Sequence, residues 1–171
     1  MKVFTAGSRM VSELCPQVRQ QIDLIIHNRD TILVGDSIGI DRAIQDYCLE
    51  KQYRYVKIFA ANGQARNNLG RFEVVNVKVG RHLKGFDYYA AKDLVMAEEA
   101  DWGLMVWNGR SKGTLNDIIH MTCLKKQVLV YYTPDESFYS LKSTADVIDL
   151  LDHNEDPGVH EFFLKQLKRR K

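Results

Sequence analysis

The chain has 171 residues, of which 45% are hydrophobic and 27% are charged, and its net charge is +2 at pH 7. This length predicts a single domain that can bury a core without disulfides. No apolar stretch is long enough to cross a membrane, the N-terminus lacks the form of a signal peptide, and the odd number of cysteines, three, argues against a disulfide framework and for the reducing cytoplasm.

The charges are unevenly distributed along the chain. Residues 51–92 are mainly basic, residues 135–161 are mainly acidic, and the chain ends with the basic run 168–171. The basic middle either faces an anionic ligand or pairs with the acidic face. We interpret the basic tail as a helix end, with a nucleic-acid-binding arm as the alternative.

The first half of the chain alternates short apolar strands with amphipathic helices. Strands are predicted at 2–6, 31–34 and 55–59, and helices from Pro16 to about Asn28 and from about Asp41 to Lys51. Strand–helix–strand units at this spacing indicate parallel strands joined by right-handed crossovers. The turns that follow the strands should therefore share one edge of the sheet.

The second half continues the alternation after an irregular stretch, residues 60–86. Within it Phe72–Val79 alternates and predicts a strand, and the stretch as a whole suits a lid, a binding loop or a dimer contact. The periodicity then predicts a helix at 86–100, a buried strand at 104–107, a helix after 114, a strand at 128–132, and helices at 143–151 and from 157.

Three strand-to-helix turns carry small and polar residues. Glycines let a ligand approach the backbone closely, and the free N–H groups at a helix start suit a phosphate. The second turn matches neither the dinucleotide fingerprint nor the P-loop. The predicted ligand-binding residues of the three turns are Gly7, Ser8, Arg9, Gly35, Asp36, Ser37, Gly39, Asn108, Gly109, Ser111, Lys112, Gly113 and Thr114.

Carboxylates near these turns are candidates for chemistry. Asp36, Asp93 or Asp117 can hold sugar hydroxyls or act as a general base, whereas the helix dipole is a sufficient reason for Asp41. Trp107 either packs in the core or stacks on a base. The histidines and cysteines show no metal-ligand spacing, so we predict neither a metal site nor a cofactor.

In their order and spacing, these turns resemble those of the SLOG superfamily, which includes DNA-processing protein A and the Lonely Guy enzymes. Residues 3–9 are similar to the opening strand and Gly-Ser turn of that family. Residues 33–43 resemble its second glycine-rich turn, in the branch with a Gly-Val-Asp-Arg pattern, and residues 100–114 resemble its Ala-Asp, strand, Gly-Thr signature. The resemblance covers residues 1 to about 132.

The resemblance implies a single SLOG-like domain of α/β class over residues 1–171. Its core, about 1–132, would be three-layered and Rossmann-like, with a mostly parallel sheet and helices on both faces, and a C-terminal helical extension would follow at about 133–171. The resemblance also implies a nucleotide or nucleotide-derived ligand, ADP-ribose-like or a nucleoside monophosphate, at the carboxyl edge of the sheet. Its phosphate would lie on Gly113, Thr114 and the Ser8 turn, and the protein would be a homo-oligomer.

The phosphoribohydrolases of this superfamily release a base from a nucleoside monophosphate with an Arg and a Glu. These positions fall here on Lys92 and Asp117, and the Pro-Gly-Gly of those enzymes is replaced within 107–112. Lys lacks the planar fork of Arg. Asp is one methylene shorter than Glu, and small misplacements of a catalytic group lower the reaction rate strongly. These departures favour ligand binding, with N-glycosidic hydrolysis by Asp117 and Lys92 as the alternative and nucleic-acid binding as the third.

Overall fold

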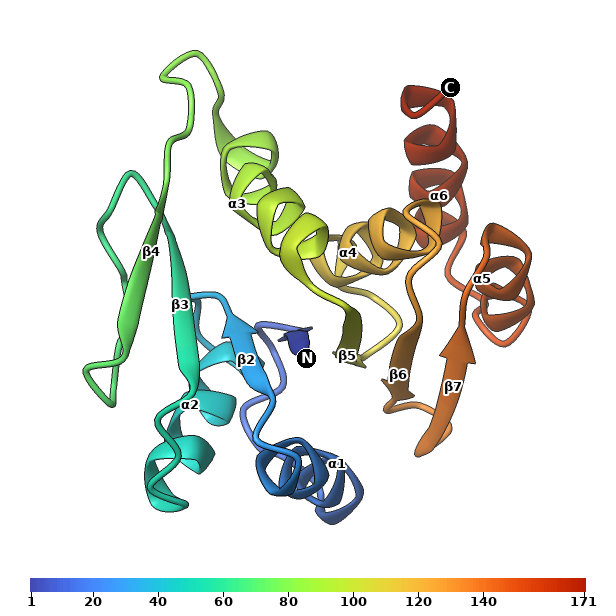
Figure 1. Cartoon of the computed structure of the whole chain (residues 1–171). Coiled ribbons are helices and arrows are strands. Elements are labelled where there is room, and N and C mark those ends of the chain that lie inside the picture. Colours follow the sequence, from blue (N-terminus) through green and yellow to red (C-terminus); the bar gives the residue numbers. More distant parts are fainter.

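The computed structural model describes residues 1–171, and in it one seven-stranded sheet lies between two layers of helices (Figure 1). The strands are β1 (Lys2–Gly7), β2 (Thr31–Val34), β3 (Val56–Ala61), β4 (Glu73–Val77), β5 (Trp102–Trp107), β6 (Val128–Tyr132) and β7 (Ser137–Leu141). The helices are α1 (Pro16–His27), α2 (Ile40–Glu50), α3 (Gly85–Glu99), α4 (Lys112–Cys123), α5 (Thr144–Leu151) and α6 (Pro157–Arg169).

The strand order is β4-β3-β2-β1-β5-β6-β7, and every neighbouring pair is parallel except β6 and β7. The first strand is thus central, with β2 on one side and β5 on the other. The chain winds outward from β1 toward β4 and then returns to β5. A sheet whose winding reverses in this way leaves a crevice at the carboxyl ends of the two central strands, where ligands of such folds bind.

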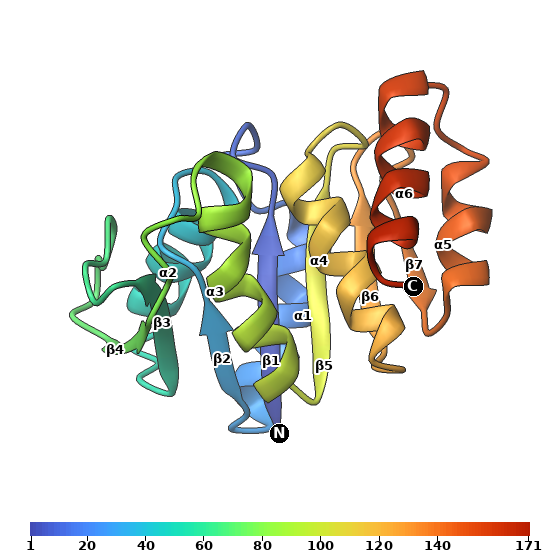
Figure 2. The same cartoon turned by 90° about the horizontal axis from the view of Figure 1, so that it is seen from above.

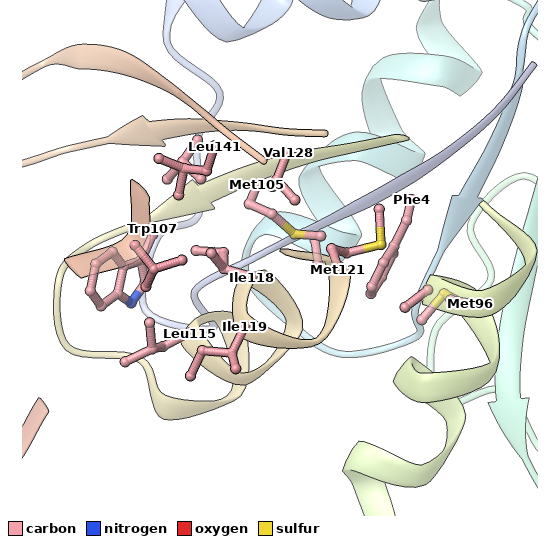
Figure 3. Packing of buried hydrophobic residues seen from close by; sticks show 14 of the residues in the cluster. Phe4, Met96, Met105, Trp107, Leu115, Ile118, Ile119, Met121, Val128 and Leu141 are labelled. Atoms are coloured by element: carbon pink, nitrogen blue, oxygen red, sulfur yellow. The ribbon is translucent and has the colours of Figure 1, made fainter. Parts of the chain in front are cut away.

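Each face of the sheet is covered by its own helices, and this explains the apolar strands. Val3 packs with α1 and α2 on one face, while its neighbour Phe4 packs with α3 and α4 on the other. Because both faces are buried, β5 is apolar along its whole length. Figure 2 shows α3, α4 and α6 in front of the sheet and α1 and α2 behind it, and Figure 3 shows side chains of β1, β5 and β6 meeting those of α3 and α4.

The predicted α/β fold, with a mostly parallel sheet and helices on both faces, is confirmed. The expected strand within 72–79 is β4, an edge strand whose Val77 lies against the core. Trp107 is fully buried and its indole N–H donates to the Ser111 carbonyl at 2.9 Å, so it packs in the core and does not stack on a base.

One strand, β7, was not predicted. It pairs antiparallel with β6 through the tight turn 133–136, and as an edge strand most of its side chains remain at least partly accessible. Its sequence therefore lacks the apolar run that marked the central strands. No helix of the structure combines the length and the apolar character needed to cross a membrane.

The C-terminal segment packs against α4. Helix α5 begins with a capping box, in which Ser143 and Asp146 satisfy each other's backbone N–H groups. Asn154, in the turn before α6, is buried and donates to the Gly109 carbonyl at 2.8 Å and to the Tyr132 hydroxyl at 3.1 Å. Residues 133–171 thus hold the loop that leads from β5 into α4.

Candidate functional site

A cavity of about 430 Å³ opens at the carboxyl ends of β1 and β5, between α3 and the start of α4. This volume suits a small organic ligand. Several of the residues that the sequence singled out line it: Gly7, Arg9, Ser37, Lys92, Ser111, Gly113, Thr114 and Asp117. The three predicted turns therefore do meet at one edge of the sheet, as parallel strands require.

The start of α4 is the part of this cavity best suited to an anion. Ser111 caps the helix by accepting a hydrogen bond from the Thr114 N–H at 3.3 Å, while the N–H groups of Lys112 and Gly113 donate to no protein acceptor. A Cβ placed on Gly113 would meet no atom within 4 Å. The helix thus offers open N–H groups and the positive end of its dipole to the cavity.

The remaining residues of the second turn support the site from outside the cavity. Gly39 has φ +80°, and a Cβ there would lie 2.5 Å from the Arg9 carbonyl oxygen. Gly35 is buried beneath Asp41 and Lys92, because its Cβ would lie 2.6 Å from Asp41 Oδ2 and 3.1 Å from Lys92 Nζ. These glycines permit close packing between protein segments, so the structure gives them a framework role.

Asp36 also lies outside the lining of the cavity. It is buried, and its carboxylate accepts from the Arg66 backbone N–H at 2.9 Å and from the Arg66 guanidinium at 2.7 Å. Burial alone would raise the pKa of Asp36, but the hydrogen bonds and charge of Arg66 outweigh it and lower the pKa. Asp36 therefore anchors the loop that follows β3. Arg66, which belongs to the basic segment 51–92 but was not singled out as a site residue, enters the cavity wall.

Two further predicted residues, Ser8 and Asn108, link the turns to each other. Ser8 is fully buried, and its hydroxyl accepts from the Asn108 N–H at 3.2 Å. The Asn108 side chain accepts in turn from the N–H groups of Arg110 and Ser111 at 3.0 and 2.9 Å, an arrangement typical of an Asx turn. These bonds fix the turn after β5 against the turn after β1.

Gly109 and Lys112 likewise do not line the cavity. Gly109 has φ +77° and faces Asn154, whose Nδ2 would lie 2.9 Å from an added Cβ. The Lys112 ammonium stands 6.0 Å from the centre of the Phe162 ring on α6. For Lys112, only its backbone N–H remains a candidate for contact with a ligand.

The floor of the cavity is a buried group of charged side chains from three helices. Lys92 on α3 is 4% exposed, and its Nζ lies 2.6 Å from Asp93 Oδ1. Burial lowers the pKa of Lys92, but the Asp93 and Asp41 carboxylates outweigh this effect and raise it above its ordinary value. Lys92 is therefore charged and already paired with the Asp93 carboxylate, so it is better suited to neutralise the buried carboxylates than to bind a phosphate.

Asp117 on α4 is buried, with only 5% of its surface exposed. Unlike Asp93, whose carboxylate accepts from Lys92, its carboxyl makes no hydrogen bond within the protein. Burial, reinforced by the Asp93 and Asp41 carboxylates, raises the pKa of Asp117 well above its ordinary value, and Lys92 opposes the shift. A raised pKa lets a carboxyl keep its proton to higher pH, and the protonated form can both donate and accept a hydrogen bond. Asp117 is thus free to contact whatever enters.

Asp41 is also a floor residue, although the sequence suggested only that it stabilises the dipole of its helix. It is buried at the start of α2 and accepts from the Ser37 N–H and hydroxyl at 3.2 and 3.0 Å. Burial raises the pKa of Asp41 to about 6, although Lys92 lowers it. In sequence this residue is indistinguishable from an ordinary acidic first-turn residue, since only the fold brings it to Lys92.

The mouth of the cavity carries aromatic and cationic side chains. Tyr89 and Phe86, on the outer part of α3, are 46% and 38% exposed, and the Arg66 guanidinium lies 4.7 Å from the centre of the Tyr89 ring. Exposed ring faces beside a cation suit a planar aromatic group. No group of three or more His, Cys, Asp or Glu side chains has the arrangement needed to hold a metal ion.

Comparison with known proteins shows the fold. No protein-family model and no curated protein matches the chain. Among solved structures it is similar to DNA processing protein A from Helicobacter pylori, described for its single-stranded DNA binding mode; the two chains are 12% identical, with a TM-score of 0.58 over 99% of this chain and 81% of that one. The likeness supports the Rossmann-like arrangement, while membership of the SLOG superfamily stays a prediction.

Proposed function

We propose that this protein binds a nucleotide or nucleotide-derived ligand in the cavity between α3 and α4. The observation that carries this proposal is the first turn of α4, where the N–H groups of Lys112 and Gly113 donate to no protein acceptor and no atom fills the space beside Gly113. A phosphate would accept from these groups. Arg9, which is exposed at the same edge, adds a positive charge.

The rest of the cavity suits the other parts of a nucleotide. The Asp117 carboxyl would bond to sugar hydroxyls at the floor, and the Tyr89 and Phe86 rings would contact the base at the mouth. The proposed contacts to phosphate, sugar and base thus lie in that order from the start of α4 to the outer part of α3. An ADP-ribose-like molecule or a nucleoside monophosphate meets all three requirements.

Ligand binding is tested with a panel of nucleotides in a thermal-shift experiment, together with mass spectrometry of the native protein for a co-purified nucleotide. A ligand at about 100 times its Kd stabilises the folded state by about 2.7 kcal/mol, which raises Tm by several degrees. Gly113→Ala fills the open space and should abolish most of this shift. Gly158→Ala is the matched control, since Gly158 is also the second residue of a helix, α6. No shift with any nucleotide at millimolar concentration would refute the proposal.

Hydrolysis of an N-glycosidic bond is the second candidate function. It is favoured by one observation: Asp117 lines the cavity without an ion pair, while the neighbouring Asp93 is paired with Lys92. Burial also raises the pKa of Asp117, which suits a proton donor. In this reaction water adds to the anomeric carbon of a nucleoside monophosphate, the bond to the base breaks, and the base leaves with a proton from Asp117. The proton that the water loses then restores the Asp117 carboxyl. The products are free base and ribose 5-phosphate.

The hydrolase candidate is tested by incubating the protein with nucleoside monophosphates and measuring free base by chromatography. Asp117→Asn should stop turnover and retain nucleotide binding in the thermal-shift experiment, because the amide keeps the size of the carboxyl but supplies no acidic proton. Equal turnover in wild type and variant removes Asp117 from the mechanism. Binding without turnover in the wild type leaves the first function standing and rejects this one.

Single-stranded nucleic acid is the third candidate ligand. It rests on the fold shared with DNA processing protein A and on the basic segment 51–92. Affinity for an oligonucleotide should then fall steeply as salt increases, because bound phosphates release counter-ions. Removal of residues 168–171 should weaken it further if the tail contributes. Salt-independent or undetectable binding would exclude this candidate.

A further inference from the structure

A second, open cavity of about 340 Å³ lies on the far side of the outer part of α3, where residues of α3, α4 and the C-terminal end of the chain line it. Phe86 and Ala90 line both cavities. One wall, formed by α3 and by Leu83 in the turn before it, is mainly apolar and includes Leu94. The facing wall, formed by α4 and α6, is polar and carries two arginines, Arg169 and Arg170.

Arg170 in this wall has a positive charge without an acidic partner. Its side chain is partly buried, and its guanidinium donates to Asn116 Oδ1 at 2.8 Å and to the carbonyl and side-chain oxygens of Gln166, both at 3.2 Å. All three acceptors are neutral. Arg169, by contrast, lies 3.5 Å from the Asp87 carboxylate. The cavity therefore presents one uncompensated positive charge.

His120, also in this wall, has an unsatisfied polar atom. Its Nε2 is buried and makes no hydrogen bond. A buried polar atom without a partner costs about 1–3 kcal/mol, and folded proteins accept such costs mainly where the atom has a use. Burial and the positive charge of Arg170 both lower the pKa of His120. An anion bound beside Arg170 would relieve this second effect.

We infer that this second cavity binds a small organic acid, with a carboxylate on Arg170 and an apolar body against Leu83 and Leu94. The single uncompensated charge matches a monoanion, and the planar guanidinium fork matches the planar carboxylate. The apolar wall would remove the body of the ligand from water. This site is separate from the nucleotide cavity, so neither proposal depends on the other.

The probe for this site is benzoate, followed by NMR of ¹⁵N-labelled protein at the His120 ring and the backbone amides of α4 and α6. Benzoate should give saturable shifts there, and the pKa of His120 should rise when it binds. Acetate, which lacks the apolar body, and benzyl alcohol, which lacks the charge, should each bind about tenfold or more weakly.

Two variants decide whether Arg170 carries the site. Arg170→Gln can still donate to Asn116 but has no charge, and it should weaken benzoate binding about tenfold or more, since a charge-assisted hydrogen bond is lost. Lys168→Gln, an exposed neighbour on α6, should change nothing, and neither should Gly113→Ala in the other cavity. Unchanged Tm values confirm that the variants fold.

The inference is overturned if benzoate gives no saturable shift, or if acetate binds as well as benzoate. It is also overturned if Arg170→Gln binds benzoate as well as the wild type. Shifts centred on Gly113 and Thr114 would place benzoate in the nucleotide cavity and equally reject the second site.

Discussion

The turn after β2 contains Gly35 and Gly39, and the turn after β5 contains Gly109 and Gly113. Around Gly39 the protein fills the space that a side chain would need, because the Arg9 backbone lies against it. Around Gly113 the protein leaves that space empty, beside two N–H groups without acceptors. A glycine that permits packing and a glycine that leaves room for a ligand have the same appearance in sequence. Their surroundings separate the two roles, and substitutions can test the difference.

The largest expected effect is at Gly39. Gly39→Ala places a Cβ 2.5 Å from the Arg9 carbonyl oxygen in a backbone conformation that side chains rarely adopt. We expect a loss of about 3 kcal/mol or more in the free energy of unfolding, measured by urea titration. A loss below about 1 kcal/mol would mean that the two turns are less tightly packed than the structure shows.

The buried carboxyl of Asp41, at the floor of the cavity, should make the stability of the protein depend on pH. The pKa of Asp41 is about 6 in the folded protein against an ordinary value of 3.8, so the folded state holds this proton more tightly. Stability should therefore fall as pH rises from about 4 to about 6, and Asp41→Asn, which has no such proton, escapes this loss. Relative to wild type, the variant should gain about 3 kcal/mol over that window.

This gain is measured by urea unfolding of both proteins at several pH values between 4 and 7. Gly113→Ala removes no titratable group and gives the reference, with a constant offset from wild type. A constant offset for Asp41→Asn as well would contradict the buried position of Asp41 beside Lys92.

Replacement of Asn154, which supports the turn after β5, should have an intermediate effect on stability. Asn154→Ala removes the donor to the Gly109 carbonyl and to the Tyr132 hydroxyl, both in a buried setting. We expect a loss of about 2 kcal/mol in stability, with weaker nucleotide binding because the start of α4 is less well held. Full stability with full binding would show that the C-terminal segment is dispensable for the site.

The smallest effect on stability is expected at Gly113. Gly113→Ala meets no atom and replaces a glycine within a helix, so the free energy of unfolding should be unchanged or rise by up to about 1 kcal/mol. Nucleotide affinity should nevertheless fall about tenfold or more, because the methyl group occupies the place of the phosphate. A destabilised variant, or one with full nucleotide affinity, would contradict the idea that Gly39 permits packing whereas Gly113 leaves room for a ligand.

The fold was largely predictable from sequence because the buried strands and amphipathic helices follow simple periodicities. The strand β7 was missed because an edge strand has no such pattern. The site was predictable only as a set of turns. The pairing of Asp36 with Arg66 depends on a loop 30 residues away. The electrostatic influence of Lys92 on Asp41 depends on two helices that are far apart in the sequence.

The position of β1 has a consequence for how the molecule folds. Val3 pairs with Ile32 on one side and with Trp102 on the other, so the central seam of the sheet joins residues that are far apart in the chain. Closing such a long loop costs entropy before any contact is gained, and folding is slowed accordingly. We expect β1, β2 and β3 with their crossover helices to associate first, and the seam between β1 and β5 to close last. The cavity between α3 and α4 lies on that seam, so the complete site would exist only in the fully folded chain.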